Sequence, residues 1–302
     1  MSREPSDDEA LAATNAACAL LRSFGKEASP RVIADRSQLV LAMEPLGVVA
    51  RVALATSRSR IGMAWVEREV RVAEHLDREG VPTTRPARSV PPGPHRQDGF
   101  VVSFWDEERP DPRPFEPATA GRLLAAAHRA LVTLPEGTVP RLGAWSETAD
   151  AMDAVVERKL LAEQERALLR RAYDRASRVV EEAVERSASV QAVHGDAHFG
   201  NVMHTTRGEL WTDWEDAFIG PVEWDLATLA SRQTLFGEEA AELPAAMAAY
   251  DGPFHPDLVQ SLGLARNVQV IAWLTLFAER DPSLHSRVLR RLAKLETQLA
   301  EA

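Results

Sequence analysis

Three oxygen-bearing side chains in the middle of the chain have the types and spacing that phosphoryl transfer requires. Asp196 and Asn201 stand five positions apart in the segment HGDAHFGN, and Asp213 follows twelve positions later. Transfer of a terminal phosphoryl group needs in-line positioning, a carboxylate facing the acceptor hydroxyl, and oxygen ligands for magnesium. Asp196 suits the carboxylate role, and Asn201 and Asp213 offer the oxygen ligands that this hard cation prefers.

The flanking sequence predicts the elements that position these side chains. Residues 190–193 have the pattern of a short buried strand, and residues 202–203 and 210–212 that of a hairpin turning at 206–208. Such a hairpin returns Asp213 to the neighbourhood of Asn201. Residues 221–230 then predict a loop and a buried helix, with acidic residues near its start, where the helix dipole favours them.

In their order and spacing, the segments HGDAHFGN, TDWEDA and GPVEWDLA resemble the aminoglycoside phosphotransferases and their relatives, which share the protein-kinase-like fold. The resemblance implies that Asp196 is the catalytic base and that Asn201 and Asp213 bind the metal. It gives His194 a structural role and makes Asp225 a buried anchor that bonds to the loop backbone. It also implies ATP as the phosphoryl donor, with GTP as an alternative, and Mg²⁺ as the metal.

Three other interpretations use the same residues. Asp, Gly and Asn are common turn formers, so the spacing alone also fits an ordinary loop. His194, Asp196 and His198 alternate along the chain and would suit one transition metal in a metal-dependent hydrolase, which leaves Asn201 and Asp213 with less to do. The third interpretation is a nucleotide-binding module without turnover.

Upstream, a charged residue interrupts an apolar strand. Residues 38–43 and 48–54 predict a hairpin in which Arg51 shares one face with Val49, while the other face is apolar. Residues 64–79 predict a helix that carries Glu69. The kinase scheme has a strand cation that binds nucleotide phosphates and pairs with a glutamate of the next helix, which assigns these roles to Arg51 and Glu69. The alternative for Arg51 is an edge-strand charge that reaches solvent.

Two features depart from the family pattern and would favour the module without turnover. Arg51 stands where the kinase scheme has lysine, although a guanidinium can bind a phosphate through two hydrogen bonds. Ser37 is assigned to the nucleotide site, but the loop around it has no glycine-rich signature.

The adenine contacts are assigned by resemblance to a strand predicted at residues 99–105. The backbone of Ser103, Phe104 and Trp105 would bond to the adenine edge, with Val49 beside the ring. The preceding residues 86–97, rich in Pro and Arg, are expected to form a mobile surface loop.

Composition narrows the class of protein. The net charge of -10 over 302 residues argues against nucleic acid as a partner and suits a cationic substrate. The single Cys18 excludes an internal disulfide, and we expect neither a signal peptide nor a membrane-spanning run. The expectation is a cytoplasmic monomer or homodimer that binds a small molecule and no membrane.

The predicted fold class is α+β, in a two-lobe protein-kinase-like fold. A small mixed N-lobe spans residues 1–105, beginning with a helix that a capping box at 6–9 opens. A mostly helical C-lobe spans residues 106–302 and contains the catalytic hairpin. Its helices are predicted at residues 118–131, 147–159, 162–187, 238–250, 256–278 and 283–300.

The acceptor is predicted to be a hydroxyl of a small polar molecule, with an aminoglycoside or another natural-product antibiotic as the leading candidate. Glu215 and Asp216, next to the predicted hairpin, are the candidate partners for an ammonium group. Trp214 and Trp224 are expected in the core. The residues themselves do not choose among antibiotics, choline and homoserine, all of which related enzymes phosphorylate.

Overall fold

The computed structural model describes residues 7–35, 38–54, 62–236, 242–279 and 281–301. The chain forms two compact units. The first contains the residues up to Pro114 together with Met203–Glu215, and the second contains Phe115–Val202 and the residues from Asp216 onward. The hairpin after the 194–201 loop therefore groups with the N-terminal part of the chain.

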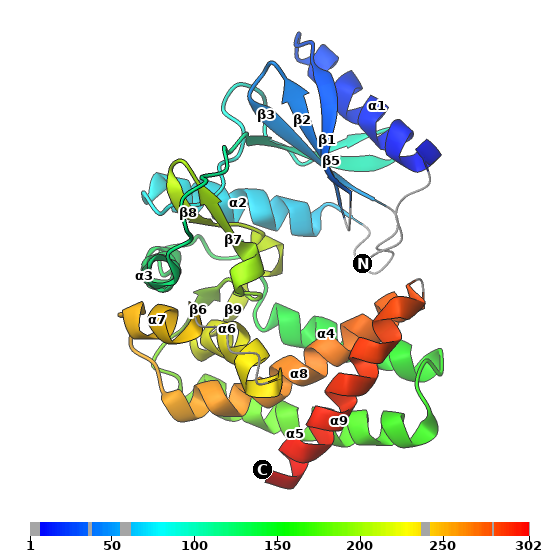
Figure 1. Cartoon of the computed structure of the whole chain (residues 1–302), viewed down its shortest axis with the longest axis vertical. Coiled ribbons are helices and arrows are strands. Elements are labelled where there is room, and N and C mark those ends of the chain that lie inside the picture. Colours follow the sequence, from blue (N-terminus) through cyan, green and yellow to red (C-terminus); the bar gives the residue numbers. More distant parts are fainter. Residues whose placement is uncertain (1–6, 36–37, 55–61, 237–241, 280, 302) are drawn as a thin grey trace. The chain divides into compact units, whose positions relative to one another are not determined.

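The first unit is built on an antiparallel sheet of five strands in the order β1-β2-β3-β5-β4 (Figure 1). The strands are β1 Ser29–Asp35, β2 Gln38–Glu44, β3 Val48–Ala53, β4 His95–Gln97 and β5 Phe100–Asp106. The β2–β3 hairpin and β5 were predicted. Strand β4 lies in the segment expected to be a mobile loop, where its pairing with β5 holds the chain instead.

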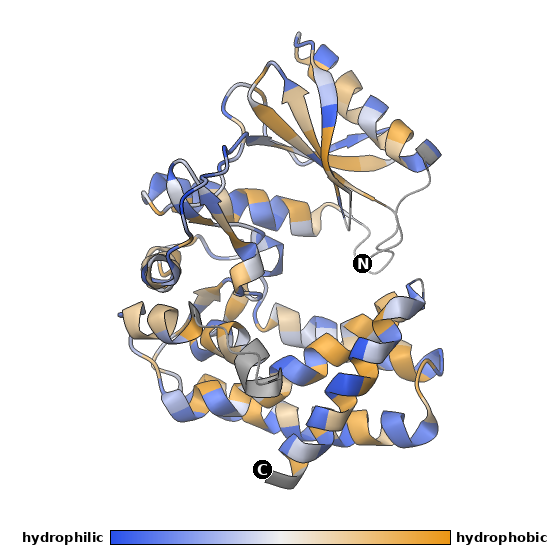
Figure 2. Ribbon diagram, in the orientation of Figure 1, coloured by the Kyte–Doolittle hydropathy of each residue, from blue (hydrophilic) through white to orange (hydrophobic). Residues whose placement is uncertain are grey.

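Alternation along β3 places its apolar and polar residues on opposite faces of the sheet. Val48, Ala50 and Val52 are buried against helix α1 (Asp7–Ser23), in a cluster that includes Leu20 and Leu21. Figure 2 shows hydrophobic residues along the strands of this sheet and along α1. Val49 and Arg51 point to the other side, as predicted. The proposed capping residue Ser6 lies outside the described residues.

Helix α2 (Ala64–Arg78) belongs to the face that carries Arg51. Its buried residues Val70 and Ala73 pack with Trp105 of β5, and Val49 adds to this small cluster. The apolar residues recur with helical spacing, so the same side of α2 also carries the buried Glu69.

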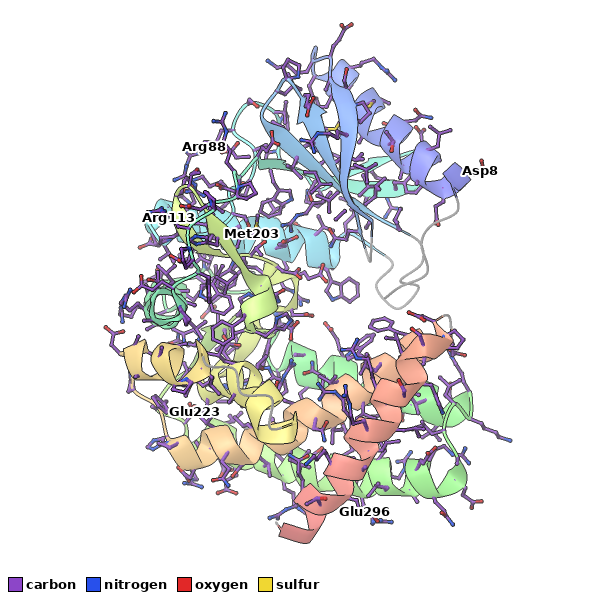
Figure 3. The ribbon with its side chains drawn as sticks, viewed as in Figure 1. Asp8, Arg88, Arg113, Met203, Glu223 and Glu296 are labelled. Carbon is purple, nitrogen blue, oxygen red and sulfur yellow. The ribbon has the colours of Figure 1, made fainter. Side chains whose placement is uncertain are left out.

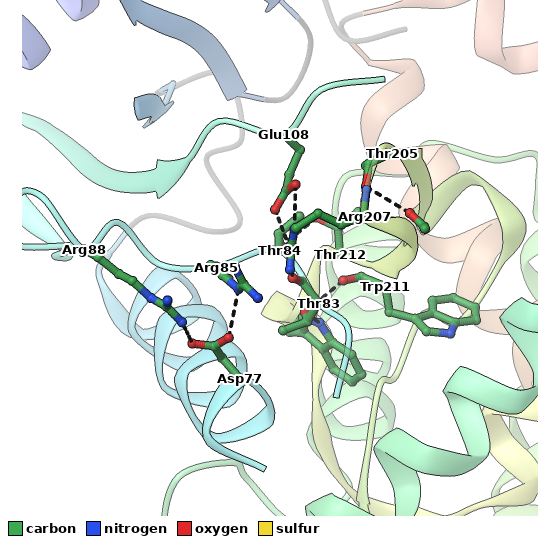
Figure 4. Close-up of polar contacts among 12 residues, drawn as sticks. Asp77, Thr83, Thr84, Arg85, Arg88, Glu108, Thr205, Arg207, Trp211 and Thr212 are labelled. Carbon is green, nitrogen blue, oxygen red and sulfur yellow. Dashed lines mark hydrogen bonds and ion pairs between the residues drawn. The ribbon is translucent and has the colours of Figure 1, made fainter. Parts of the chain in front are cut away.

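Polar contacts hold the hairpin of β7 (Val202–Thr205) and β8 (Gly208–Trp211) to the N-terminal part of the first unit (Figure 4). The Thr83 hydroxyl donates to the Trp211 carbonyl at 2.9 Å. Arg207 donates to the Thr83 carbonyl at 3.0 Å and pairs with Glu108. These contacts join segments more than 90 residues apart in the sequence.

The second unit is mostly helical, and its only strands among the described residues are β6 (Val190–Val193) and β9 (Phe218–Pro221), which pair with each other. Its helices are α3 Pro117–Leu131, α4 Gly143–Glu157, α5 Glu163–Arg186, α6 Glu223–Phe236, α7 Glu242–Ala249, α8 Pro256–Ala278 and α9 His285–Glu301. All seven were predicted, although the expected start of α7 at residue 238 lies outside the described residues.

Helix α8 forms the centre of the second unit, where it contacts α4, α5, α6 and α9. By length and composition it is apolar enough to cross a membrane, which sequence analysis had not expected of any segment. However, 61% of its apolar window is buried inside the protein, and it carries the buried polar residues Arg266, Asn267 and Gln269. These are features of a core helix.

The contact between α3 and α7 gives a test of this packing. A Cβ at Gly121 would lie 1.9 Å from the Ala246 carbonyl oxygen. We expect Gly121→Ala to lower the free energy of unfolding by about 1–3 kcal/mol, because the two helices would have to separate. The measurement is urea unfolding followed by circular dichroism.

Gly263→Ala is the matched control, because Gly263 is also helical and a Cβ there meets no described atom within 4 Å. Because alanine has a higher helix propensity than glycine, we expect an unchanged or slightly higher free energy of unfolding. Equal losses in the two variants would contradict this account of the α3–α7 contact.

Candidate active site

The buried carboxylate of Asp225, in the first turn of α6, anchors the start of the 194–201 loop. Its Oδ2 accepts the backbone N–H of His194 at 2.7 Å, and its Oδ1 accepts that of Gly195 at 2.8 Å. These are bonds to loop backbone, of the kind that the resemblance implies for this residue. Because the carboxylate is fully buried, it holds both amides without competition from water.

His128 on α3 completes the environment of Asp225, and sequence analysis did not find it. Its Nε2 lies 2.9 Å from Asp225 Oδ2, and its Nδ1 lies 2.8 Å from the Tyr250 hydroxyl. Burial, followed by the nearby charges of Asp225 and Glu223, raises the pKa of Tyr250, so this hydroxyl stays protonated. No local pattern marks His128, because its partner is 97 residues away.

Gly195 is required by the tight path of the loop. Its φ is +86°, and a Cβ would lie 2.1 Å from the Asp216 carbonyl oxygen, so no side chain fits here. Its own carbonyl accepts the indole N–H of Trp224 at 2.9 Å. The loop is therefore fixed on both sides immediately before Asp196.

Asp196 lies between two cationic or potentially cationic side chains. Arg266 Nη2 of α8 donates to its Oδ1 at 2.6 Å, and His198 Nε2 lies 3.4 Å from its Oδ2. Burial would raise the pKa of Asp196, but His198, Arg266 and His194 together outweigh it and hold this pKa below its usual range. The carboxylate is therefore ionised at neutral pH and able to accept a hydrogen bond.

Asn201 ends the loop in a short 3₁₀ turn, Phe199–Asn201. Its Nδ2 donates to the Asp196 carbonyl at 3.0 Å, which joins the two ends of the loop. With the nitrogen used in this way, the amide oxygen is the atom left to ligate a metal. The chain then enters β7 at Val202, one residue before Met203, which Figure 3 labels.

In the first unit, Arg51 is the partly buried cation that sequence analysis paired with Glu69. Its guanidinium forms an ion pair with that carboxylate and donates to Thr212 Oγ1 at 3.0 Å. It also lies 4.8 Å from the centre of the Trp105 ring, at cation–π distance. Burial would lower the pKa of Arg51, but Glu69 and Asp213 outweigh it and raise this pKa, so the charge is retained.

Asp213 directly follows Thr212 and has a left-handed backbone, with φ of +68°. Asp tolerates this region better than most residues, and such conformations gather at functional sites. Glu215, two residues later, accepts from Gln38 Nε2 at 3.1 Å, and its carbonyl accepts from Arg68 at 2.8 Å. Asp216 belongs to the second unit, where its carbonyl lies against Gly195.

The remaining residues assigned to nucleotide binding lie on β3 and β5. The Ser103 hydroxyl accepts the Trp105 indole N–H at 2.9 Å. The Phe104 N–H donates to the Pro92 carbonyl at 2.9 Å, so an adenine contact through this group would have to replace that bond. Val49 packs beside Trp105. Ser37 lies outside the described residues.

Within the second unit, the structure brings together four predicted residues: His194, Asp196, Asn201 and Asp225. Within the first, it brings together Arg51, Glu69 and Asp213. The hydrolase interpretation finds no support in the described part of the chain, where no three His, Cys, Asp or Glu residues form a group suited to a metal. The His194 Nδ1 instead accepts from the Asp196 backbone N–H at 3.3 Å.

Solved structures of small-molecule kinases share this fold. Amicoumacin kinase hAmiN, in complex with AMP-PNP and Ca²⁺, is 12% identical, with a TM-score of 0.68 over 89% of this chain and 88% of that chain. The GDP and kanamycin complex of APH(2″)-IIia is 16% identical, with a TM-score of 0.67 over 92% and 97%. A microcompartment-associated aminopropanol kinase is 19% identical, with a TM-score of 0.64 over 91% and 93%. The predicted protein-kinase-like α+β fold is confirmed.

Residues 51–262, more than half of the chain, match the model of the phosphotransferase enzyme family. The chain belongs to this family, which confirms the resemblance found in the sequence. It is therefore an enzyme, a phosphotransferase. A search of the curated proteins finds no match.

The Asp225 anchor gives a direct prediction. In Asp225→Asn the new amide cannot accept both backbone N–H groups as a carboxylate does, and His128 loses a charged partner. We expect the free energy of unfolding to fall by about 1–3 kcal/mol, because a buried backbone N–H is left without an acceptor. Thermal unfolding measures this loss.

Asp251→Asn is the control, because Asp251 forms an exposed ion pair with Arg129 in the same unit. Its melting temperature should match that of the wild type. If Asp225→Asn is equally stable, the proposed anchor is not a structural constraint.

Proposed function

We propose that this enzyme is an ATP-dependent, Mg²⁺-requiring O-phosphotransferase that modifies a small natural product, with an aminoglycoside or related antibiotic as the leading acceptor and resistance as the biological outcome. The observation that carries the proposal is the ionised Asp196, held at a fixed place by an anchored loop. The class of acceptor is suggested by the similar structures, which include an amicoumacin kinase, a spectinomycin phosphotransferase, a kanamycin complex and an aminopropanol kinase.

Asp196 would act on the acceptor hydroxyl. Its carboxylate accepts the hydroxyl hydrogen bond and then the proton as the acceptor oxygen bonds to the γ-phosphorus. The bond from the γ-phosphorus to the bridging oxygen breaks, and ADP leaves. Because the pKa of Asp196 is lowered, its main contribution is orientation of the hydroxyl in the ionised state, with proton transfer late in the reaction.

Arg51 fits the role of a phosphate ligand. It is a permanently charged group in a partly buried position, held by Glu69, Thr212 and the ring of Trp105. A guanidinium fixed in this way presents its remaining N–H groups in one plane, which matches two oxygens of a phosphate. Arg51 could therefore bind a phosphate in place of the lysine of the kinase scheme.

Asn201 and Asp213 fit the role of magnesium ligands. The Asn201 amide oxygen and the Asp213 carboxylate are hard oxygen donors, and Asp213 stands next to Thr212, which contacts Arg51. Bound Mg²⁺ would neutralise charge on the transferred phosphoryl group. GTP is an alternative donor, because one similar structure contains GDP.

The residues proposed to contact the acceptor are chosen for their negative charge. Glu215 and Asp216 follow the hairpin, and the chain has a net charge of -10, which favours a substrate with ammonium groups. The single cysteine suits a reducing compartment, so we place the reaction in the cytoplasm, where ATP is available. A monomer or homodimer would suffice, and neither nucleic acid nor a membrane is required.

Mass spectrometry of a defined acceptor panel tests the function. The enzyme is incubated with ATP, Mg²⁺ and one of kanamycin, spectinomycin, amicoumacin, choline or aminopropanol. We expect a mass gain of one HPO₃ unit on at least one antibiotic, and no gain with Asp196→Asn. Nucleotide binding without transfer to any hydroxyl compound would favour the binding module instead.

Two substitutions test the assigned roles separately. Asp196→Ala should lower kcat by about a hundredfold or more, the usual loss when a general base is removed. Asp213→Ala should abolish the Mg²⁺-dependent activity. Steady-state kinetics at several Mg²⁺ concentrations measure both, and an Asp196→Ala variant with full activity would refute the proposed base.

Arg51→Ala tests the phosphate contact. Loss of a charge-assisted hydrogen bond of about 1.5–3 kcal/mol predicts that ADP binds roughly ten- to a hundredfold more weakly in isothermal titration calorimetry. Arg71→Ala is the control, because Arg71 forms an exposed ion pair with Glu67 on α2. Equal affinity of the Arg51→Ala and Arg71→Ala variants would rule out the phosphate role.

A further inference from the structure

Arg266 is a buried cation that ends at the reactive loop. It lies on α8, with 6% of its side chain exposed. Nη2 donates to Asp196 Oδ1 at 2.6 Å, and Nη1 lies 3.4 Å from the Gly195 carbonyl. Nη1 also bonds to Gln269 Oε1, and the guanidinium lies 5.6 Å from the centre of the Trp224 ring. All of these contacts are within the second unit.

The buried position of Arg266 is unfavourable for the free energy of folding. Its neighbours on α8, such as Ala265, Val268 and Ile271, belong to the apolar core. A buried charge loses its hydration, and a well-packed apolar side chain in its place is often no less stable. Its Nε is also buried without a hydrogen-bond partner among the described residues. Stability alone therefore does not account for an arginine here.

Its contacts orient one carboxylate oxygen. The Gln269 side chain accepts a hydrogen bond from the guanidinium through its Oε1. Its Nε2 in turn lies 3.4 Å from the Ala144 carbonyl of α4. The guanidinium then reaches both the Gly195 carbonyl and Asp196 Oδ1, which restricts rotation of the Asp196 side chain. Oδ2 is left on the side of His198, whose side chain is 39% exposed.

We propose that Arg266 is a positioning residue for phosphoryl transfer: by binding Oδ1 of Asp196, it presents Oδ2 to the acceptor hydroxyl. This inference rests on the proposed function of Asp196 and adds a residue outside the matched family range, which ends at residue 262. Small misplacements of a catalytic group reduce rates strongly, so the benefit is a carboxylate held in one orientation.

A second buried arginine in the same unit provides a matched control. Arg291 on α9 is 9% exposed, and its Nη1 donates to Asn267 Oδ1 of α8 at 3.2 Å. It therefore also joins α8 through a buried guanidinium, at the position next to Arg266. A purely structural effect of removing an arginine should appear equally in both variants.

The experiment compares wild type, Arg266→Ala, Arg266→Lys and Arg291→Gln with Asp196→Asn as the inactive reference. The acceptors are the five named above and water, the last as acceptor-free ATP hydrolysis. We expect Arg266→Ala to lower kcat about tenfold or more, with the KM for ATP and the calorimetric Kd for ADP within about twofold of wild type. Arg266→Lys should have an intermediate kcat, because an ammonium keeps the charge but lacks the planar set of N–H donors of a guanidinium.

Two further results belong to the expected outcome. A low concentration of guanidinium ion should restore part of the kcat of Arg266→Ala and none of that of Asp196→Asn. Arg291→Gln should lower the melting temperature and leave kcat within about twofold of wild type, since its guanidinium bonds to Asn267 of α8.

Several results would overturn the inference. One is an active wild type with an Arg266→Ala variant of equal kcat; if that variant does not fold, an Arg266→Lys variant with wild-type kcat has the same meaning. Another is a parallel loss of kcat and ADP binding in Arg266→Ala and Arg291→Gln. These leave the proposed function intact, whereas a wild type without turnover on any acceptor overturns both proposals.

Discussion

A single buried carboxylate, that of Asp225, is the constraint on which the rest of the reactive loop depends. It accepts two consecutive backbone N–H groups, from His194 and Gly195, and has His128 as its third partner. Gly195 follows a path that no residue with a Cβ could take, and Asn201 closes the loop on the Asp196 carbonyl. Asp196 is thus held by its backbone on both sides, so its carboxylate can be ionised and fixed at once. Orientation of that carboxylate is what the chemistry needs from the protein.

Opposite charges are organised separately in the two units. In the second unit, the anionic Asp196 faces Arg266 and His198. In the first, the cationic Arg51 faces Glu69 and lies close enough to Asp213 for that charge to raise its pKa. Each unit therefore carries a partly buried charged group whose partners keep it ionised. This arrangement suits a reaction in which the protein contributes positioning and electrostatic stabilisation, with little covalent chemistry of its own.

Local patterns in the sequence predicted the elements that local interactions determine. The β2–β3 hairpin, α2 and the helices of the second unit follow from alternation, helical periodicity and turn residues. Strands β1 and β9 were missed, because their pairing partners and not their own patterns define them. The family segments led to Asp196, Asn201, Asp213 and Asp225. They could not lead to His128 or Arg266, which meet their partners across 97 and 70 residues of chain. Nor could they predict that Thr83 and Arg207 would join the hairpin to the first unit.

The central claim is that Asp196 remains an oriented carboxylate without a metal bond, that Asn201 and Asp213 bind the metal, and that Arg51 binds the phosphates. The most direct measurement is a crystal structure of the full chain with AMP-PNP and Mg²⁺. The account predicts metal bonds from the Asn201 amide oxygen and the Asp213 carboxylate, and a phosphate oxygen at the Arg51 guanidinium. It also predicts that Asp196 Oδ1 stays on Arg266 with no metal bond. Phosphates bound away from Arg51 and Asp213, or a metal held by His194 and His198, would contradict it.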